Sequence, residues 1–436
     1  MPESRYIGMS TFIIGLFFML FAQALLGIFT FFAFSWILSE DRGAVKKRRV
    51  VQGFVVQVAL ATLLTQLPFI RSSFEYLTKG VEALKDATQT GTRFVFGYLG
   101  GGDVPFEATG STFVFALQAL PMIIVVSALS MLLFHWGILP WVVSRISYFW
   151  RKAMHIGGAL GTAAAAKIFL GNIEAPLVVR PYLKDFSRSE LFSIMACGMA
   201  TTSATVMTLY TTILKDVIPE TIGHILTASI ISIPAALTIA RIMVPENSKV
   251  QTSGNLVMPY QFSNWVDALS RGTSDGLNIF LNVTAMLIVV LAIVALGNSM
   301  LSMLPHVSGE AVTFQRLLGL LFAPITWLMG ISWSEAITAG RLLGTKTVLN
   351  EVVAFIEMAK LQQGQLSAMS SLIMMYALCG FANFSAVGIV IGGMGAMVPE
   401  RRQEIVNLSL KSVVAGTLAT CLSGTIIGIL TRLSMP

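Results

Sequence analysis

Two glutamates stand in apolar stretches of the chain, each within a short segment of similar pattern. Glu174 lies in KIFLGNIEAPLVVRPYL and Glu335 in MGISWSEA, and each is followed by an alanine and, six residues on, by an arginine. A carboxylate at membrane depth costs on the order of 2.5–3.5 kcal/mol on insertion scales, so it usually faces a cavity or a partner. Its two oxygens can accept hydrogen bonds from the vicinal diol of a sugar. The alternative for each glutamate is a structural ion pair with Arg180, Arg341 or Lys167.

Two asparagines and a phenylalanine could complete a binding site. Asn383 offers an amide that both donates and accepts hydrogen bonds, and Phe381 adds an aromatic face, which together suit a polar substrate with a flat ring. Asn172 offers the same amide, although both asparagines could instead cap broken helix ends. Four hydroxyls could be added by Thr201, Thr202, Ser203 and Thr205, and their alternative is back-bonding to the preceding turn of an intact helix.

The composition places these residues in a membrane protein. Of the 436 residues, 55% are hydrophobic and 12% are charged, whereas a soluble domain has about a quarter charged residues. Eight stretches free of Asp, Glu, Lys and Arg are long enough to span a bilayer: residues 11–38, 50–70, 108–144, 191–214, 221–240, 276–309, 361–399 and 412–431. The basic residues, 29 against 22 acidic ones, lie in short loops between the stretches, which indicates topology signals and not a nucleic-acid surface.

The loop charges predict an orientation. Basic residues cluster between the first two stretches and between the last two, so we expect these loops in the cytoplasm and both termini outside. Residues 153–187 and 312–349 begin and end on the same side, the cytoplasmic and the outer side respectively. Both segments are therefore predicted to be re-entrant hairpins. Each is followed by a stretch with small and polar residues at its middle, which indicates broken helices at about 191–214 and 366–399.

A hairpin and a broken helix that occur twice, from opposite sides, are typical of an inverted-repeat transporter. We therefore predict an all-α integral membrane protein with about eight transmembrane helices. Residues 1–110 would form N-terminal helices and residues 111–436 the transport core. The cysteines and histidines form no ligand spacing and no catalytic motif is present, so we expect no metal, no cofactor and no enzyme.

Three ordered segments resemble the motifs of a known family. GNIEAPLVVRPYL is similar to the G-Q-T-E-A-P-L-L-V-R-P-Y-L signature of the concentrative nucleoside transporter family, and MGISWSEA and CGFANFSAVGI resemble its two other site motifs. The resemblance covers the chain from about residue 108 to the end. It implies eight spanning helices, an interfacial helix at about 76–99, two opposed hairpins, two broken helices and a homotrimer in the bacterial inner membrane.

The resemblance also implies a substrate site. By position, the base would contact Asn172, Ile173, Glu174 and Val206, and the ribose would contact Glu335, Phe381 and Asn383. Ala386 stands where many members have a serine near the ribose. Asn172 and Ile173 replace Gln and Thr of the signature, so a nucleoside or close analogue is expected without a defined base.

Lys167 is the sharpest departure from the family pattern, because sodium-coupled members have an asparagine there as part of the sodium site. A fixed ammonium could replace the ion, so we expect proton-coupled, sodium-independent symport, with Thr201 and Thr202 in the same ion-coupling region. The alternative for Lys167 is snorkelling toward the cytoplasm or pairing with Glu174. Alternatives for the function are a sodium symporter, a carrier of a related solute, or, in a different class, an intramembrane receptor or enzyme.

Overall fold

The computed structural model describes residues 3–105, 112–214, 217–218, 220–247, 262–306 and 311–434. The domain boundary predicted at residues 110 and 111 lies outside these residues. Within them every regular element is a helix. The main helices are α1 (Glu3–Ile37), α2 (Lys47–Gln66), α3 (Pro68–Phe96), α4 (Phe115–Gln118), α5 (Met122–His135), α6 (Ile138–Met154), α7 (Gly158–Ala166), α8 (Glu174–Leu177), α9 (Arg188–Ala200), α10 (Ala204–Leu214), α11 (Thr221–Met243), α12 (Trp265–Leu301), α13 (Phe314–Leu328), α14 (Trp333–Val348), α15 (Glu351–Ala359), α16 (Ala368–Leu378), α17 (Phe384–Met397) and α18 (Arg402–Leu433).

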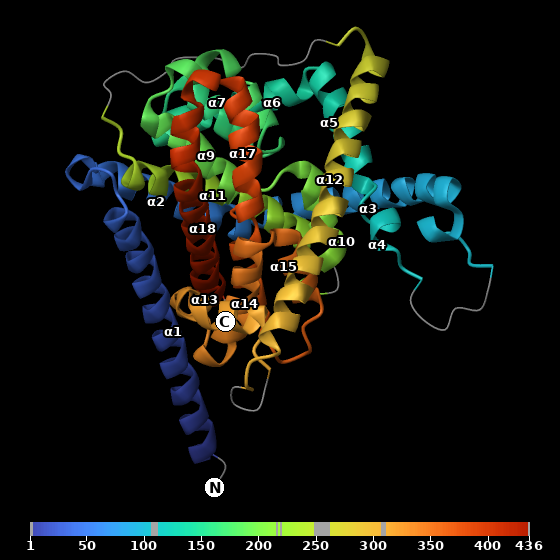
Figure 1. Cartoon of the computed structure of the whole chain (residues 1–436). Coiled ribbons are helices and arrows are strands. Elements are labelled where there is room, and N and C mark those ends of the chain that lie inside the picture. The colour runs from blue at the N-terminus through green and yellow to red at the C-terminus, as the bar shows by residue number, and fades with distance from the viewer. Residues whose placement is uncertain are drawn as a thin grey trace.

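The apolar helices confirm the predicted membrane fold. Among the described residues, seven helical segments are long and apolar enough to cross a bilayer, and they match seven of the eight predicted stretches. The eighth stretch, residues 361–399, contains two shorter apolar helices, α16 and α17, which form the second broken helix. Figure 1 shows α1 and α12 on opposite sides of the bundle, with α3 projecting sideways as the predicted interfacial helix would.

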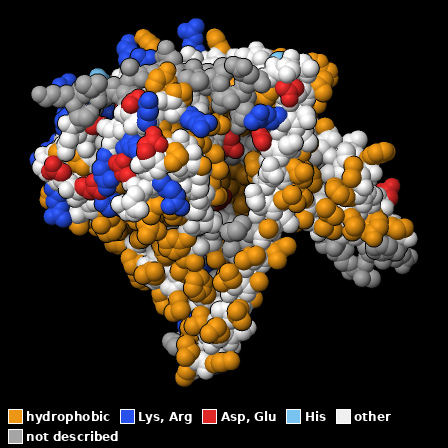
Figure 2. All heavy atoms as spheres, turned by 45° about the horizontal axis from the view of Figure 1, so that its top comes forward, with side chains coloured by type: hydrophobic (Ala, Val, Ile, Leu, Met, Phe, Trp, Pro, Cys, Tyr) orange, Lys and Arg blue, Asp and Glu red, His pale blue; other side chains and the backbone are white. Residues whose placement is uncertain are grey.

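Charged and apolar side chains occupy different parts of the surface. Figure 2 shows Lys, Arg, Asp and Glu side chains gathered over one end of the molecule and hydrophobic side chains over the opposite, tapering part. This separation is expected for a chain whose apolar surface contacts lipid and whose charged end contacts water.

The first hairpin is formed by α7 and α8. The small side chains of α7 are all buried, which lets this short helix pack closely inside the bundle. The chain turns between Lys167 and Ile173 and returns through α8 and a 3₁₀ segment, Arg180–Asp185. In Figure 1 this hairpin lies at the opposite end of the bundle from α13 and α14, so the two hairpins are opposed.

The second hairpin is a sharply bent helix pair. The axes of α13 and α14 differ by 117°, and the turn between them contains Gly330 in the left-handed region, with φ +90°. The two helices approach closely, because a Cβ on Gly340 would lie 2.6 Å from the carbonyl oxygen of Gly319. Side chains from other helices hold the turn: Gln23 donates to the Ile331 carbonyl at 2.9 Å, and Arg432 donates to the Gly330 carbonyl at 2.6 Å.

The two broken helices meet at their breaks. The first is interrupted between α9 and α10, at Thr201–Ser203, and the second between α16 and α17, at Cys379–Asn383. A Cβ on Gly380 would lie 2.9 Å from the carbonyl oxygens of Met199 and Ala200, so the second break packs directly on the end of α9. Non-helical backbone at this depth needs partners inside the protein. The Lys346 ammonium supplies one by donating to the Ala377 carbonyl at 2.7 Å, near the end of α16.

A cluster of ion pairs joins three helices at the charged end. Glu40, just after α1, accepts hydrogen bonds from Arg188 of α9 at 2.9 Å and from Lys411 of α18 at 2.7 Å. Arg188 also contacts Glu404 at 3.3 Å. The hydrogen bond from Arg188, together with Lys411, lowers the pKa of Glu40 from 4.5 to about 2.

Replacing Glu40 should therefore weaken the folded state in a pH-dependent way. Because its pKa is lower in the folded protein, the stabilisation is complete above pH 4.5 and is lost as the pH falls toward about 2. At pH 7 we expect E40Q to lower the free energy of unfolding by roughly 0.5–1 kcal/mol, as for partly exposed pairs, and the difference from wild type to shrink on acidification. Thermal unfolding in detergent across this pH range measures both effects. E82Q, which changes an exposed glutamate on α3, is the control, and an equal loss in both variants would contradict the assignment.

Candidate functional site

A cavity of about 300 Å³ lies between the first hairpin, the two helix breaks and the start of α15. Helices α5 and α12 close its other side. Seven predicted site residues line it: Asn172, Ile173, Glu174, Val206, Phe381, Asn383 and Ala386. The lining is mostly apolar with a few polar groups, and the volume is that of a small-molecule site.

The most buried carboxylate of the cavity is Glu351, which the sequence reasoning missed. Its Oε1 accepts a hydrogen bond from the Tyr210 hydroxyl at 2.8 Å, and its Oε2 accepts one from Asn383 Nδ2 at 2.8 Å. Only 4% of Glu351 is exposed. Each oxygen retains a lone pair for another donor, so a ligand hydroxyl could bind there without displacing either partner.

Asn383 links this carboxylate to the second helix break. Its Oδ1 accepts from the Ala386 backbone N–H at 2.8 Å and from the Ser385 hydroxyl at 2.6 Å, so it caps α17. The same side chain donates to Glu351 through Nδ2. Capping and a place at the cavity, which the sequence left as alternatives, therefore occur together at this one residue.

Glu335 lies elsewhere, and the prediction that it shares a chamber with Glu174 is wrong. It sits in the first turn of α14 and does not line the cavity. Its carboxylate accepts hydrogen bonds from the Ser367 backbone N–H at 2.8 Å, the Ser367 hydroxyl at 3.3 Å and the Ser370 hydroxyl. Glu335 therefore holds the N-terminus of α16.

The sequence did contain a signal that could have indicated Glu351 as a site residue. Glu351 is the acidic residue of NEVVAF and stands directly before a run of apolar residues.

Glu174 lies at the tip of the first hairpin. Its Oε2 would be 2.3 Å from a Cβ placed on Gly171, so the carboxylate folds back over that glycine. Among the described residues none forms a close ion pair with it, but its carboxylate still interacts electrostatically with the Lys167 ammonium, so the predicted pairing with Lys167 persists as a longer-range attraction. Glu174 therefore faces the cavity with its hydrogen-bonding capacity available to a ligand.

Lys167 lies behind the cavity wall and does not line the large cavity itself. It caps α7, is 2% exposed, and places its Nζ 4.9 Å from the centre of the Phe381 ring and 3.5 Å from the Leu170 carbonyl oxygen. This burial excludes snorkelling. The ammonium instead joins the first hairpin to the second helix break, beside a small hollow that it lines together with Asn172.

The two threonines of the predicted ion-coupling region form hydrogen bonds within the protein. Thr201 donates to the Cys197 carbonyl at 2.8 Å, which is the back-bonding alternative, and the Thr202 hydroxyl lies 2.9 Å from that of Ser229 on α11. Neither lines the cavity, whereas Ser203 and Thr205 do. On the opposite wall the polar lining residues, none of them predicted, are Ser127, Ser130, Asp275 and Asn282.

Comparison with known families gives consecutive matches along the chain. A family model described as the Na+ dependent nucleoside transporter N-terminus matches residues 26–99, and the model for its C-terminus matches residues 224–428. A model described as nucleoside recognition matches residues 116–216, between the other two.

Several relatives are similar over nearly the whole chain. The chain is 36% identical over 408 residues to the uncharacterized transporter YutK of Bacillus subtilis, covering 93% of this chain and 98% of that protein. It is 34% identical over 411 residues to the nucleoside permease NupC of Helicobacter pylori, covering 93% and 97%. The sodium/nucleoside cotransporter 1 of Rattus norvegicus is 30% identical over 424 residues, covering 93% of this chain and 63% of the longer relative.

A solved structure has the same fold. CNTnw in an inward-facing substrate-bound state superposes with a TM-score of 0.86 at 35% identity, covering 94% of this chain and 99% of that one.

The position of Glu335 predicts a stability effect without a binding effect. We expect E335Q to lower the free energy of unfolding by on the order of 1 kcal/mol, because the amide keeps one acceptor oxygen but loses the charge at the start of α16. Thermal unfolding measures this loss. A variant with unchanged stability but a lost ligand would contradict the placement of Glu335 outside the cavity.

Proposed function

Because this chain belongs to the concentrative nucleoside transporter family, we propose that it imports nucleosides or close analogues by proton-coupled symport. The chain is a multi-pass membrane transporter of nucleosides and not an enzyme. We also propose how the substrate is held and which ion is coupled. The chain would import its substrate as a homotrimer in the bacterial inner membrane.

The observation that carries the substrate proposal is the buried carboxylate in the cavity. Glu351 is fixed by Tyr210 and Asn383 in an orientation that leaves acceptor capacity toward the cavity. A ribose offers two neighbouring hydroxyls to such an acceptor. The base would then lie toward the first hairpin, between the apolar side chains of Ile173, Val206 and Phe381, with the Asn172 and Glu174 side chains at its polar edge.

The hairpin tip would make base selection loose. Ile173 brings an apolar side chain to the tip, and the Asn172 Oδ1 atom is buried with no hydrogen-bond partner in the described structure. A binding site discriminates strongly between two ligands only where its own polar groups form hydrogen bonds with one ligand and are left without a partner by the other. Only the Asn172 and Glu174 side chains offer such groups to the base here, so we expect several bases to be accepted.

Replacing Glu351 should abolish substrate binding. We expect E351Q to weaken nucleoside binding at least tenfold, because it loses the charge and one of two acceptors toward the ribose. Y210F should cause a smaller loss, because it removes only a positioning hydroxyl. Isothermal titration with a panel of nucleosides on purified protein measures both, with E335Q as the matched control that retains binding. Normal binding by E351Q would remove Glu351 from the site.

The proton-coupling proposal depends on Lys167. As an ammonium it places a positive charge at the start of the turn of the first hairpin, next to the ring of Phe381, and would reduce the attraction for a second cation there. One proton driven inward by 100 mV supplies about 2.3 kcal/mol, or roughly fifty-fold accumulation, so sodium is not required energetically.

Sodium coupling is the second candidate. It is favoured by the descriptions of the two matching family models and by the name of the rat relative, all of which include sodium.

Uptake into sealed proteoliposomes separates the two. We expect labelled nucleoside to accumulate when an inward proton gradient is imposed and not when an inward sodium gradient is imposed alone. Accumulation also separates transport from binding alone, since a receptor concentrates nothing. Stimulation by sodium at constant pH would refute proton coupling and leave the nucleoside site untouched.

Assembly would account for the uncovered face of α12. Its side chains Ile288, Ile293, Leu296 and Met300 are 60–66% exposed. In a homotrimer part of this face would pack against neighbouring subunits and the remainder would contact lipid.

A further inference from the structure

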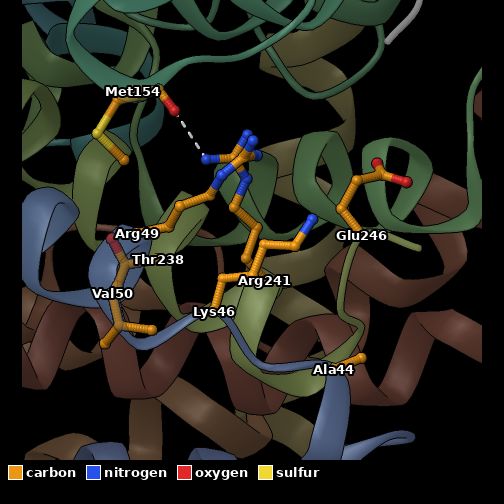
Figure 3. A pocket seen from close by; sticks show the side chains of 8 residues that line it. All are labelled: Ala44, Lys46, Arg49, Val50, Met154, Thr238, Arg241 and Glu246. Carbon is orange, nitrogen blue, oxygen red and sulfur yellow. Dashed lines mark hydrogen bonds between the residues drawn. The ribbon is translucent and has the colours of Figure 1, made fainter. Parts of the chain in front are cut away.

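A second, separate hollow lies at the charged end of the molecule. It is lined by Lys46 and Arg49 at the start of α2, Met154 at the end of α6, and Arg241 and Glu246 at the end of α11, with Ala44, Val50 and Thr238 completing the wall (Figure 3). None of these residues lines the substrate cavity. Three cationic side chains and one carboxylate therefore face a space with no role in the proposed transport site.

The two guanidinium groups differ in their hydrogen bonding. Arg241 donates to the Met154 carbonyl at 2.8 Å and to the His155 carbonyl at 3.0 Å, so it caps the C-terminus of α6. Arg49 has no such role. Its Nη1 is buried, yet within the described parts of the chain it has no hydrogen-bond partner. Figure 3 shows the two guanidinium groups lying side by side.

This arrangement compensates the positive charge only in part, because Glu246 and Glu190 act on Arg241 while Arg49 repels it. Two neighbouring guanidinium groups repel one another, and a buried donor without an acceptor costs free energy. The carboxylate of Glu246 also accepts the Ser187 hydroxyl at 2.6 Å, so its charge is shared with a donor outside the hollow. The N-terminus of α2 adds partial positive charge, because Lys46 precedes it without a side-chain cap.

We propose that the hollow binds the oxygens of a phosphate group. Guanidinium groups match phosphate geometry, and the N-terminus of α2, which carries Arg49 in its first turn, favours an anion. The hollow is about 20 Å³, enough for one or two oxygens, so the rest of the ligand would lie outside it. Phosphate bound there would join the α1–α2 connection to the ends of α6 and α11. The phosphate could belong to an anionic lipid headgroup or to a soluble phosphate compound, since basic hollows between membrane helices accept either chemistry.

Binding to purified full-length protein tests the proposal. The probes are inorganic phosphate, with chloride at equal ionic strength as reference, and phosphatidylglycerol in mixed micelles, with phosphatidylcholine as reference. We expect at least one phosphate probe to raise the melting temperature relative to its reference, and R49Q to weaken its apparent affinity at least fivefold. R48Q is the matched control, because Arg48 is the exposed neighbour in the chain and does not line the hollow.

A second variant covers the case in which R49Q does not fold. Lys46 is exposed, so K46Q should fold and should weaken the same probe at least twofold. An effect of phosphatidylglycerol alone assigns a lipid headgroup, an effect of inorganic phosphate alone assigns a soluble phosphate compound, and an effect of both assigns the shared chemistry. The proposal is overturned if neither probe exceeds its reference, or if R48Q weakens binding as much as R49Q or K46Q.

Discussion

The structure depends on satisfying the backbone of two interrupted helices inside an apolar bundle. Where α9 and α16 stop, carbonyl and amide groups lose their helical partners at a depth where water does not replace them. The protein supplies partners of its own: the Lys346 ammonium reaches the Ala377 carbonyl, and the Asn383 side chain caps α17. Because Gly380 lies directly on the backbone of Ala200, the two sets of exposed groups lie next to each other. The cavity and its polar lining exist at the place where these breaks meet.

Much of the fold could be predicted from the sequence, because it follows from the length and position of apolar stretches. The hairpin at 153–187 was recognisable from small residues and internal charges between two basic loops, and the breaks from polar clusters such as ATTSAT. The seven cavity residues that were predicted correctly as neighbours lie close to these breaks or to the hairpin tip. Local sequence singled out Asn172, Glu174, Phe381 and Asn383, whereas Ile173, Val206 and Ala386 were placed by the resemblance to the family motifs. Their roles in binding remain predictions.

The wrong prediction, Glu335, also has a physical reason. Local similarity between the two hairpin segments paired Glu335 with Glu174, but α14 is a 16-residue helix and Glu335 lies in its first turn. Glu351 follows the other end of that helix, which is about 24 Å long at 1.5 Å per residue. A sequence pattern does not reveal which end of a re-entrant helix points inward. Tyr210, Asp275 and Asn282 were missed for a related reason, because their proximity to the cavity is set by packing between distant helices.

The attachment of the second hairpin has a consequence for how the molecule can change shape. Gln23 of α1 and Arg432 of α18 both donate to carbonyls in the turn between α13 and α14. A displacement of that turn must therefore carry the middle of α1, at Gln23, and the end of α18, at Arg432, with it or break both bonds. Within the described structure the first hairpin tip is joined to another element through the contact of Lys167 with the Phe381 ring and not through hydrogen bonds to its backbone, and one of its own amide oxygens, on Asn172, is unbonded. The turn of the second hairpin is thus more restrained than the tip of the first, although the two hairpins belong to one inverted repeat. The less restrained hairpin is the one that presents Ile173 and Glu174 to the cavity.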